Sequence, residues 1–396
     1  MNHYFKRLFF QISFSGVFIL LVLGAKQTIA QDNLNINPML CPVDSMNMLL
    51  SDSFYIWGST VVKGKDGKFH MFYSRWPHGK RSLEDDSMNY IFDGFSGWLK
   101  YCEIAYAVSD SLTGPFVFKG VVLKGDWKAG KWDRYTMTNP QIRCFEGKYY
   151  LYYVANSYDS TFNVKRSVSK EMLHWYRYNC TQKIGVLIAD SPEDFVKGKF
   201  EKSEEPLMQA DGKNTFEISN NPSVTQGPDG KYFMIFKSRV PEVGHMTMWI
   251  ATADKPYGPF TLVSSVFTDA DMSSEDACIW YDSERKQFYA AVKYYSNSGK
   301  LIQQFGGLGL LTSKNGFDWS PAQNPLISLR VLKLKNGKTL ELENLERPFI
   351  VTDEKGQPIA LFAAFSVKKP GSIKAEEYTS EYNTGNVGIL LKNNKK

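Results

Sequence analysis

Three carboxylates occupy matching places in two segments of similar sequence. Glu275-Asp276-Ala277 and Glu346-Arg347-Pro348 each begin an apolar run, with the acids one or two places before the small residue or proline. Hydrolysis of a glycosidic bond needs two carboxyl groups, one to protonate the leaving oxygen and one to activate water or attack the sugar. Carboxylates that crowd together raise the pKa of one member, which suits a general acid at neutral pH. We therefore expect Glu346 to be the general acid and Asp276 or Glu275 to be the base or nucleophile.

Basic, polar and aromatic side chains near these acids could hold a substrate. Arg75 and Arg239 end matching apolar runs, and arginine recognises carboxylates through paired hydrogen bonds. In the structural alternative, the arginines only neutralise buried acids, and the acids only accept backbone N–H bonds. Glu217 and Asp133, which precede two other copies of the motif, are reserve acids. The expected substrate-binding residues are Arg239, Lys293, His245, Arg75, Trp57, Asn221 and Arg347.

The acids belong to a strand–turn–strand pattern that recurs along the chain. The clearest copy runs from Asn220 to Arg239, where Pro228-Asp229-Gly230 supplies a tight turn between two apolar runs. Proline presets φ and glycine tolerates positive φ, as such a turn requires. Four further copies have turns near 65–68, 145–148, 282–286 and 353–356, and a third apolar run follows every copy. Gly-Pro-Phe segments after the first and third copies are typical of edge strands, where proline is tolerated.

Five four-stranded units predict an all-β fold, a five-bladed β-propeller of antiparallel blades. The blades are expected near 52–124, 136–205, 217–268, 273–322 and 343–393. Little chain remains for the last strand of the fifth blade, so the segment at 43–51 is expected to close the ring. A β-sandwich is the rival fold, but it needs no fivefold repeat. Because the innermost strands of a propeller line its channel, their first residues should converge on one funnel.

On these repeats and on Glu346-Arg347-Pro348, the chain resembles the five-bladed propeller glycoside hydrolases of families 43, 32 and 117. The resemblance covers nearly all of residues 45–393 as architecture. In families 43 and 32 a catalytic Glu stands two residues before a proline or small residue, as Glu346 does. Those families also carry an Asp on the first blade and an acid on the third, where this chain has Trp57-Gly58-Ser59 and Asn220-Asn221-Pro222. The resemblance therefore implies glycosidase chemistry moved to the fourth and fifth blades, or a different family on the same scaffold.

Residues 1–30 have the pattern of a secretory signal peptide. Lys6 and Arg7 precede an apolar run from Leu8 to Leu23, and Thr28-Ile29-Ala30 forms a small-x-small cleavage pattern. Cleavage would leave residues 31–396 as one periplasmic or secreted domain without a membrane span. An uncleaved anchor is the alternative, because the apolar run is long.

Composition narrows the classes of partner. The formal net charge is +6 with both signs interspersed, which is not the footprint of a nucleic-acid-binding protein. The five cysteines are widely spaced without a CxxC pair, so we expect no metal or redox motif, although one disulfide could form in an oxidising compartment. Cys144 and Cys278 are expected to be small buried hydrophobic residues. No cofactor is expected, and a structural Ca²⁺ ion in the channel is an option that the inner carboxylates leave open.

The sequence thus favours an exported, monomeric, exo-acting glycoside hydrolase whose partner is a plant- or algal-type oligosaccharide. The basic residues near the funnel are compatible with an acidic sugar. Two alternatives remain: a glycoside phosphorylase with a basic phosphate pocket, and a carbohydrate-binding propeller without catalysis. Turnover of a glycan library separates the binding protein from both enzymes, and dependence on phosphate separates the phosphorylase from the hydrolase.

Overall fold

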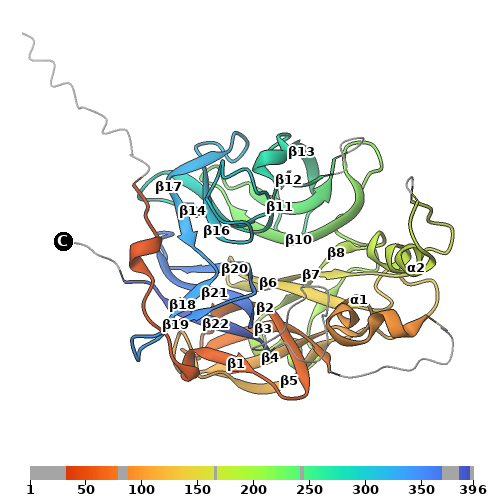
Figure 1. The fold of residues 1–396 in the computed structure, drawn as a ribbon, viewed down its shortest axis with the longest axis horizontal. Helices are drawn as coiled ribbons and strands as arrows, with labels where there is room; N and C mark the ends of the chain where they lie inside the picture. Colours follow the sequence, from red (N-terminus) through yellow and green to blue (C-terminus); the bar gives the residue numbers. More distant parts are fainter. Residues whose placement is uncertain (1–32, 79–87, 165–166, 241–244, 368–382, 393–396) are drawn as a thin grey trace, which may run out of the picture. The chain divides into compact units, whose positions relative to one another are not determined.

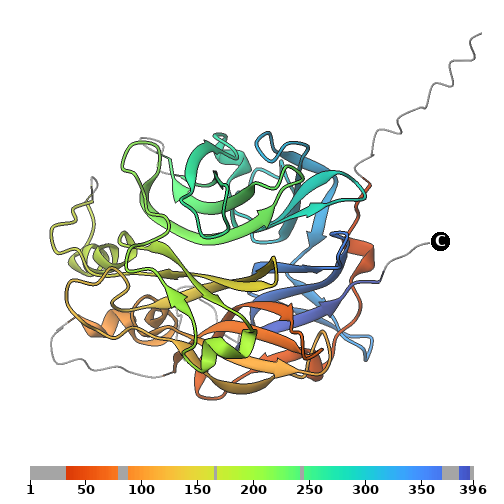
Figure 2. The same ribbon diagram turned by 180° about the vertical axis from the view of Figure 1, so that it is seen from behind.

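Five four-stranded antiparallel sheets follow one another as the blades of a propeller, which confirms the predicted fold. The structure is a computed structural model that describes residues 33–78, 88–164, 167–240, 245–367 and 383–392. These residues belong to the unit Asp32–Lys396, and the predicted signal peptide lies outside the described residues. Figures 1 and 2 show the blades arranged in sequence order, starting with the orange first blade. The blue fifth blade lies next to the first blade.

Each of the first four blades uses four consecutive strands, which are hydrogen-bonded in chain order. The first blade has β2 (Phe54–Lys63), β3 (Phe69–Pro77), β4 (Glu103–Ser109) and β5 (Val117–Leu123). The second has β6 (Met137–Phe145), β7 (Lys148–Ala155), β8 (Lys183–Ala189) and β9 (Glu201–Lys202). The third has β10 (Phe216–Gln226), β11 (Tyr232–Arg239), β12 (Met246–Ala253) and β13 (Thr261–Ser265). The fourth has β14 (Ser274–Asp282), β15 (Gln287–Tyr294), β16 (Leu308–Ser313) and β17 (Ser320–Ser328).

The fifth blade joins the two ends of the described chain. It consists of β20 (Asn344–Thr352), β21 (Pro358–Val367), β22 (Asn383–Leu390) and the early strand β1 (Met48–Leu50). In β1, Met48 pairs with Val387 and Leu50 pairs with Gly385. An additional hairpin, β18 (Val331–Lys333) and β19 (Thr339–Glu341), lies between the fourth and fifth blades in the sequence. The ring is therefore closed by pairing between segments that are far apart in the chain.

The turn between β10 and β11 illustrates how local sequence sets strand register. Gly230 adopts φ +82°, which is accessible to glycine at little cost. The Gly227 amide donates to the Lys231 carbonyl at 2.7 Å, and the Asp229 carboxylate accepts from the Lys231 amide at 3.2 Å. This closed turn sets the register near it, with Ser223 opposite Ile235, and a register shift before Ser223 then places Asn220 opposite Lys237. The register decides which side chains of the second strand reach the funnel.

Two long connections carry short helices toward the first strands. The segment α1 (Trp98–Tyr101) lies between β3 and β4, and α2 (Lys170–Asn179) lies between β7 and β8. The two helices lie side by side in Figure 1. Leu99 packs in one buried cluster with Tyr135 and Tyr178. A further helix, α3 (Pro192–Val196), follows β8. The packing fixes the loop that presents Trp98 to the funnel.

The cysteines correct one expectation. All five lie in the described part of the chain, and each is a free thiol. Cys278 is buried as expected, whereas Cys144 is exposed. Cys144 shares a strand face with the buried Ile142, but it is the next-to-last residue of β6, where the strand runs into the exposed turn. Across the described ranges, no helix has the length and apolar character needed to cross a membrane.

Candidate active site

The five inner strands share one irregularity at the same place. In each strand the register with its neighbour shifts directly around the residue that precedes the proline-equivalent position. That residue has positive φ in every blade, which makes the irregularity a β-bulge of the same form five times. These residues are Gly58 (+38°), Asn139 (+52°), Asn221 (+52°), Asp276 (+61°) and Arg347 (+55°).

The residue types at these bulges fit the left-handed conformation, with one exception. Glycine, asparagine and aspartate adopt positive φ more readily than other residues, but arginine is disfavoured by about 1–2 kcal/mol. A Cβ atom on Gly58 would lie only 3.3 Å from the Arg347 Cγ and Nε atoms. Gly58 therefore leaves room for the Arg347 side chain. An unfavourable backbone conformation that is held by its surroundings is typical of functional sites.

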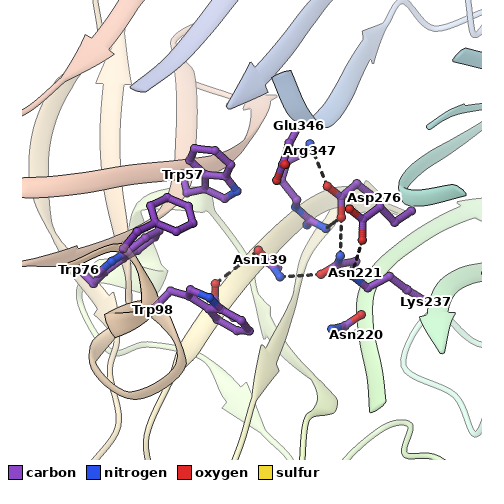
Figure 3. Close-up of a pocket in the computed structure, with 13 residues that line it drawn as sticks. Trp57, Trp76, Trp98, Asn139, Asn220, Asn221, Lys237, Asp276, Glu346 and Arg347 are labelled. Carbon is purple, nitrogen blue, oxygen red and sulfur yellow. Dashed lines mark hydrogen bonds and ion pairs between the residues drawn. The ribbon is translucent and has the colours of Figure 1, made fainter. Parts of the chain in front are cut away.

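Hydrogen bonds join four of the bulge residues into a chain across the channel. The Asn139 side-chain amide donates to Asn221 Oδ1, and the Asn221 amide donates to Asp276 Oδ1, each at 2.5 Å. Arg347 donates to the same carboxylate through its backbone N–H at 3.2 Å and its guanidinium at 3.4 Å. Figure 3 shows this chain running from Asn139 to Arg347. It fixes the orientation of the buried Asp276 carboxylate.

Two lysines connect the remaining carboxylates. Lys237 Nζ lies 2.7 Å from Glu275 Oε2, and Lys293 Nζ lies 2.9 Å from Glu275 Oε1. Lys293 also lies 2.5 Å from Glu346 Oε1, so it bridges the fourth and fifth blades. The cluster holds three carboxylates (Glu275, Asp276, Glu346) and three cations (Lys237, Lys293, Arg347). Protonation of any one carboxylate would give the whole cluster a net positive charge.

The two glutamates have opposite pKa shifts. Burial alone would raise the pKa of Glu275, but Lys237 and Lys293 outweigh it and hold that pKa well below its ordinary value. Burial raises the pKa of Glu346, and the neighbouring Asp276 and Glu275 carboxylates raise it further against the opposing effect of Lys293. Burial would lower the pKa of Lys293, yet Glu275 and Glu346 raise it well above its usual value. Glu275 is therefore ionised at neutral pH, while Glu346 is the carboxyl best placed to hold a proton.

These groups border a cavity of about 160 Å³ with two unlike walls. Trp57, Trp76, Phe95 and Trp98 form the aromatic wall, in which the Phe95 ring meets Trp57 edge-on at 5.0 Å and Trp76 edge-on at 5.1 Å. The charged cluster forms the facing wall (Figure 3). An aromatic face beside directed polar groups is a common arrangement at carbohydrate sites, because a sugar ring has both apolar and hydroxyl-bearing faces.

The cavity adjoins a wider chamber of about 530 Å³. The two spaces share Trp98, Asn220, Lys237 and Glu275 in their linings. Arg239 and His245 line only the wider chamber. Burial lowers the pKa of His245, although Asp269 opposes the effect. The imidazole is thus neutral at neutral pH.

Most of the residues expected from the sequence come together at this site. Glu275, Asp276, Glu346, Trp57, Asn221 and Arg347 line the inner cavity, Lys293 contacts two of its acids, and Arg239 and His245 line the chamber. The reserve acids lie elsewhere: Glu217 forms an ion pair with Arg239, and Asp133 forms one with Lys202.

Arg75 and Lys293 are the expected binding residues that line neither space, and of the two only Lys293 contacts the acids of the cavity. Arg75 forms an ion pair with Glu103 at 2.8 Å, and its guanidinium lies over the Phe54 and Phe118 rings. The sequence comparison of Arg75 with Arg239 was out of register by one residue. Ser74 pairs with Trp57 just as Lys237 pairs with Asn220, so Ser74 is the counterpart of Lys237. Two residues later in each strand, Trp76 is therefore the counterpart of Arg239. A shift of one residue in a strand reverses the face to which a side chain points.

Lys237, Trp76 and Phe95 were absent from the expected set. Lys237 could have been found from the sequence, because it pairs with Asn220 as Lys293 pairs with Glu275, at the same place in the repeat. Trp76 needed the correct register, and Phe95 belongs to a loop without a repeat signal. Among the residues that the structure describes, no group of three or more His, Cys, Asp or Glu side chains could hold a metal ion.

Solved structures of glycoside hydrolases share this fold. A family 117 glycoside hydrolase of the marine bacterium Zobellia galactanivorans aligns with a TM-score of 0.56 at 16% identity, covering 89% of this chain and 88% of that one. An α-L-arabinofuranosidase from Lactobacillus brevis aligns with a TM-score of 0.54 at 11% identity, covering 92% and 95%. An endo-arabinase from Bacteroides thetaiotaomicron aligns with a TM-score of 0.50 at 13% identity, covering 89% and 99%.

Sequence comparison adds no closer assignment. No protein-family profile matches the chain, and no curated protein matches it. At such low identity the similar structures establish the fold alone. They confirm the scaffold that the sequence resembles, the five-bladed propeller of glycoside hydrolases.

Proposed function

We propose that this protein is a glycoside hydrolase whose active site is the inner cavity, which all five blades line and to which the fourth and fifth blades supply the carboxylates. The observation that carries the proposal is the pair of glutamates with opposite pKa shifts, Glu346 raised and Glu275 lowered, joined through Lys293. Glycoside hydrolysis requires one carboxyl group that holds a proton and one that is ionised. Solved structures of similar fold include a family 117 glycoside hydrolase, an α-L-arabinofuranosidase and an endo-arabinase, which supports the proposal.

Glu346 is the general acid in this proposal. Its raised pKa keeps the proton that the leaving oxygen must receive. Asp276 is the base or nucleophile. A carboxylate has roughly four acceptor sites, and the described contacts of Asp276 use three, which leaves room for a water molecule or a sugar carbon. Glu275 is a weaker base because two ammonium groups suppress its proton affinity, and its role is to hold Lys237 and Lys293 in place.

The substrate class follows from the cavity and from the proteins of similar fold. We propose that the aromatic wall stacks against the sugar at the cleaved bond and that cleavage occurs from a chain end, because the inner cavity is small beside the chamber. Arabinose-containing and algal oligosaccharides are the first substrates to test, since an arabinofuranosidase, an arabinase and a marine enzyme share the fold. With the signal-peptide prediction, the site of action would be periplasmic or extracellular.

The phosphorylase alternative has less support at this cavity. Lys237, Lys293 and Arg347 each already contact a carboxylate. A phosphate group would have to compete with these acids for its binding partners. The binding-protein alternative predicts affinity without turnover, so the same assay tests it.

The decisive experiment compares wild type with Glu346→Gln on a panel of arabinose-containing and algal oligosaccharides. The proposal expects wild type to release reducing sugar and the variant to bind the same substrate with little or no turnover. Equal turnover by both proteins would show that Glu346 is not the general acid. Binding by both without any turnover would favour the carbohydrate-binding propeller, and turnover that requires added phosphate would favour the phosphorylase.

A further inference from the structure

The wider chamber has features that cleavage of the bond does not require. Its lining combines Arg239 and His245 with Trp175 and Tyr295, beyond the residues shared with the inner cavity. We infer that this chamber binds a sugar that carries an anionic group, either a carboxylate or a sulfate ester, next to the sugar at the cleaved bond. The inference rests on the proposed function, because it extends the same substrate cleft.

The charges of the chamber favour an anion. Its described lining includes Lys237 and Arg239 as cations and Glu275 as the carboxylate, and Glu217 balances the charge of Arg239. Glu275 is already in contact with both Lys237 and Lys293. When Glu346 holds its proton, the adjoining cluster keeps three cations against two carboxylates. A bound carboxylate or sulfate would therefore enter a region of net positive charge.

Arg239 is held in a fixed direction at the chamber wall. Its Nε atom lies 2.7 Å from Glu217 Oε2, and it is paired with Phe216 across the strands. Glu217 itself has φ +63°, a conformation that glutamate rarely adopts. Backbone strain of this kind persists where surroundings enforce it, often at binding sites. A guanidinium with a fixed plane is suited to paired hydrogen bonds with a carboxylate or sulfate.

His245 supplies polar atoms that the described protein leaves unused. Both ring nitrogens are buried, and neither has a hydrogen-bond partner among the described residues. Buried polar atoms without partners are uncommon and call for an explanation such as a ligand. A neutral imidazole can donate one hydrogen bond and accept another, which matches a sugar hydroxyl beside the anionic group.

The chamber also has surfaces on which a second sugar ring can stack. Tyr295 is 43% exposed and lies against Phe305, with ring centroids 5.1 Å apart. Trp175 extends into the lining from α2. These aromatic faces share the chamber with Arg239, so they would bind the ring while Arg239 binds its substituent.

The first test measures binding with the inactive Glu346→Gln variant by isothermal titration calorimetry. The probes are matched pairs: an oligogalacturonide with its carboxyl-reduced form, and a sulfated galactan oligosaccharide with its desulfated form. We expect the anionic member of one pair to bind about tenfold or more tightly, as a charge-assisted contact would give. The pair that shows the difference identifies the group as a carboxylate or a sulfate.

The second test adds Arg239→Gln to the same background. We expect this substitution to abolish the preference for the anionic oligosaccharide and to leave the affinity for its neutral counterpart unchanged. Because this change leaves Glu217 without its ion pair, the double variant Glu217→Gln/Arg239→Gln provides a charge-balanced alternative if the single variant is unstable. Arg75→Gln is the matched control: it also breaks an Arg–Glu ion pair, but Arg75 lines neither space, so this variant should keep the preference.

The outcomes separate this inference from the proposed function. Equal affinity for charged and neutral members of both pairs, or a preference that survives the loss of Arg239, would overturn the inference. Hydrolysis of a neutral oligosaccharide by wild type would leave the proposed function intact in that case. If wild type prefers the anionic oligosaccharide through Arg239 but hydrolyses no substrate, the inference about the chamber is supported and the proposed hydrolase activity is contradicted.

Discussion

At the scale of single residues, Lys293 controls how the acids share their charge. It contacts both Glu275 and Glu346, and it is itself buried. Glu275 has a second ammonium group in Lys237, so its ionised form is doubly compensated. Within the described ranges, Glu346 has only the shared lysine as an ion-pair partner, and two neighbouring carboxylates disfavour its ionisation. Glu346 can thus hold a proton while Glu275 stays ionised, because two ammonium groups contact Glu275 and one contacts Glu346.

The pH dependence of activity should report Glu346. Its pKa is raised in the folded protein, so the protonated form survives to higher pH than for an exposed glutamate and is lost as pH rises through that pKa. We expect kcat/KM of wild type to fall on the alkaline side of its optimum for this reason. A pH–rate profile checks the expectation. A profile that stays flat from neutral to alkaline pH would contradict the assignment of Glu346 as the acid.

Replacing Lys293 with methionine should move that profile and destabilise the protein. Lys293 favours the ionised form of Glu346, so its loss should raise the pKa of Glu346 and shift the alkaline limb upward. Removing one partner from a buried ion pair costs about 3–5 kcal/mol of unfolding free energy. The profile and a urea titration measure the two effects. Lys231→Met, at an exposed turn, is the control, and equal effects of the two variants would rule out a special role for Lys293.

At the scale of elements, the bulge in each inner strand is what turns side chains toward the channel. Without it, the strict alternation of a strand would send adjacent residues such as Glu275 and Asp276 to opposite faces. With Asp276 at φ +61°, both acids line the same cavity. The bulge therefore doubles the number of functional groups that one strand can supply.

Substitutions at Asn221 should expose the cost of this bulge. At φ +52° alanine is strained and glycine is not, so we expect Asn221→Ala to be less stable than Asn221→Gly by about 1–2 kcal/mol. Both changes remove the amide that donates to Asp276, so both should lower kcat/KM by about tenfold or more. Denaturant titration and steady-state kinetics measure these effects.

The adjacent Asn220 provides the matched control for Asn221. It is not among the positive-φ residues, so the order should reverse there, with Asn220→Ala more stable than Asn220→Gly by about 0.5–1 kcal/mol. The same order at both positions would argue against a left-handed conformation at Asn221.

The strands were predictable from the sequence because their signals are local. A turn such as Asp229-Gly230 between apolar runs specifies two strands and their register. The bulge was not predictable, because the residue types at Gly58, Asn221 and Asp276 are also common in ordinary turns, and arginine, as at Arg347, seldom adopts positive φ. The repeat predicted that Glu275, Asp276 and Glu346 would converge, and they line one cavity. No sequence pattern indicated that Lys293 would bridge two blades. That contact depends on the packing of one blade against the next.

At the scale of the whole molecule, the blades are joined by contacts that cross the channel. Arg143 of β6 donates to the carbonyl of Val224 through Nε and to the carbonyl of Ile279 through its guanidinium, each at 3.0 Å. Its guanidinium also lies 4.8 Å from the Phe349 ring centroid. One side chain of the second blade therefore contacts the third, fourth and fifth blades. The pairing of β1 with β22 closes the ring at the outer edge, and Arg143 connects it inside.

Replacing Arg143 should weaken the ring without touching the catalytic groups. In Arg143→Met, two carbonyls lose their donor, and unsatisfied buried carbonyls cost roughly 2–4 kcal/mol together. Arg143→Lys should restore little, because an ammonium group lacks the planar set of N–H donors that reaches both carbonyls at once. Urea denaturation should show lower stability for both variants, while kcat/KM per folded molecule stays near wild type. Full stability in Arg143→Met would mean that blade-to-blade packing alone holds the inner ring. A loss of kcat/KM at full stability would mean instead that Arg143 acts on the site through the inner strands.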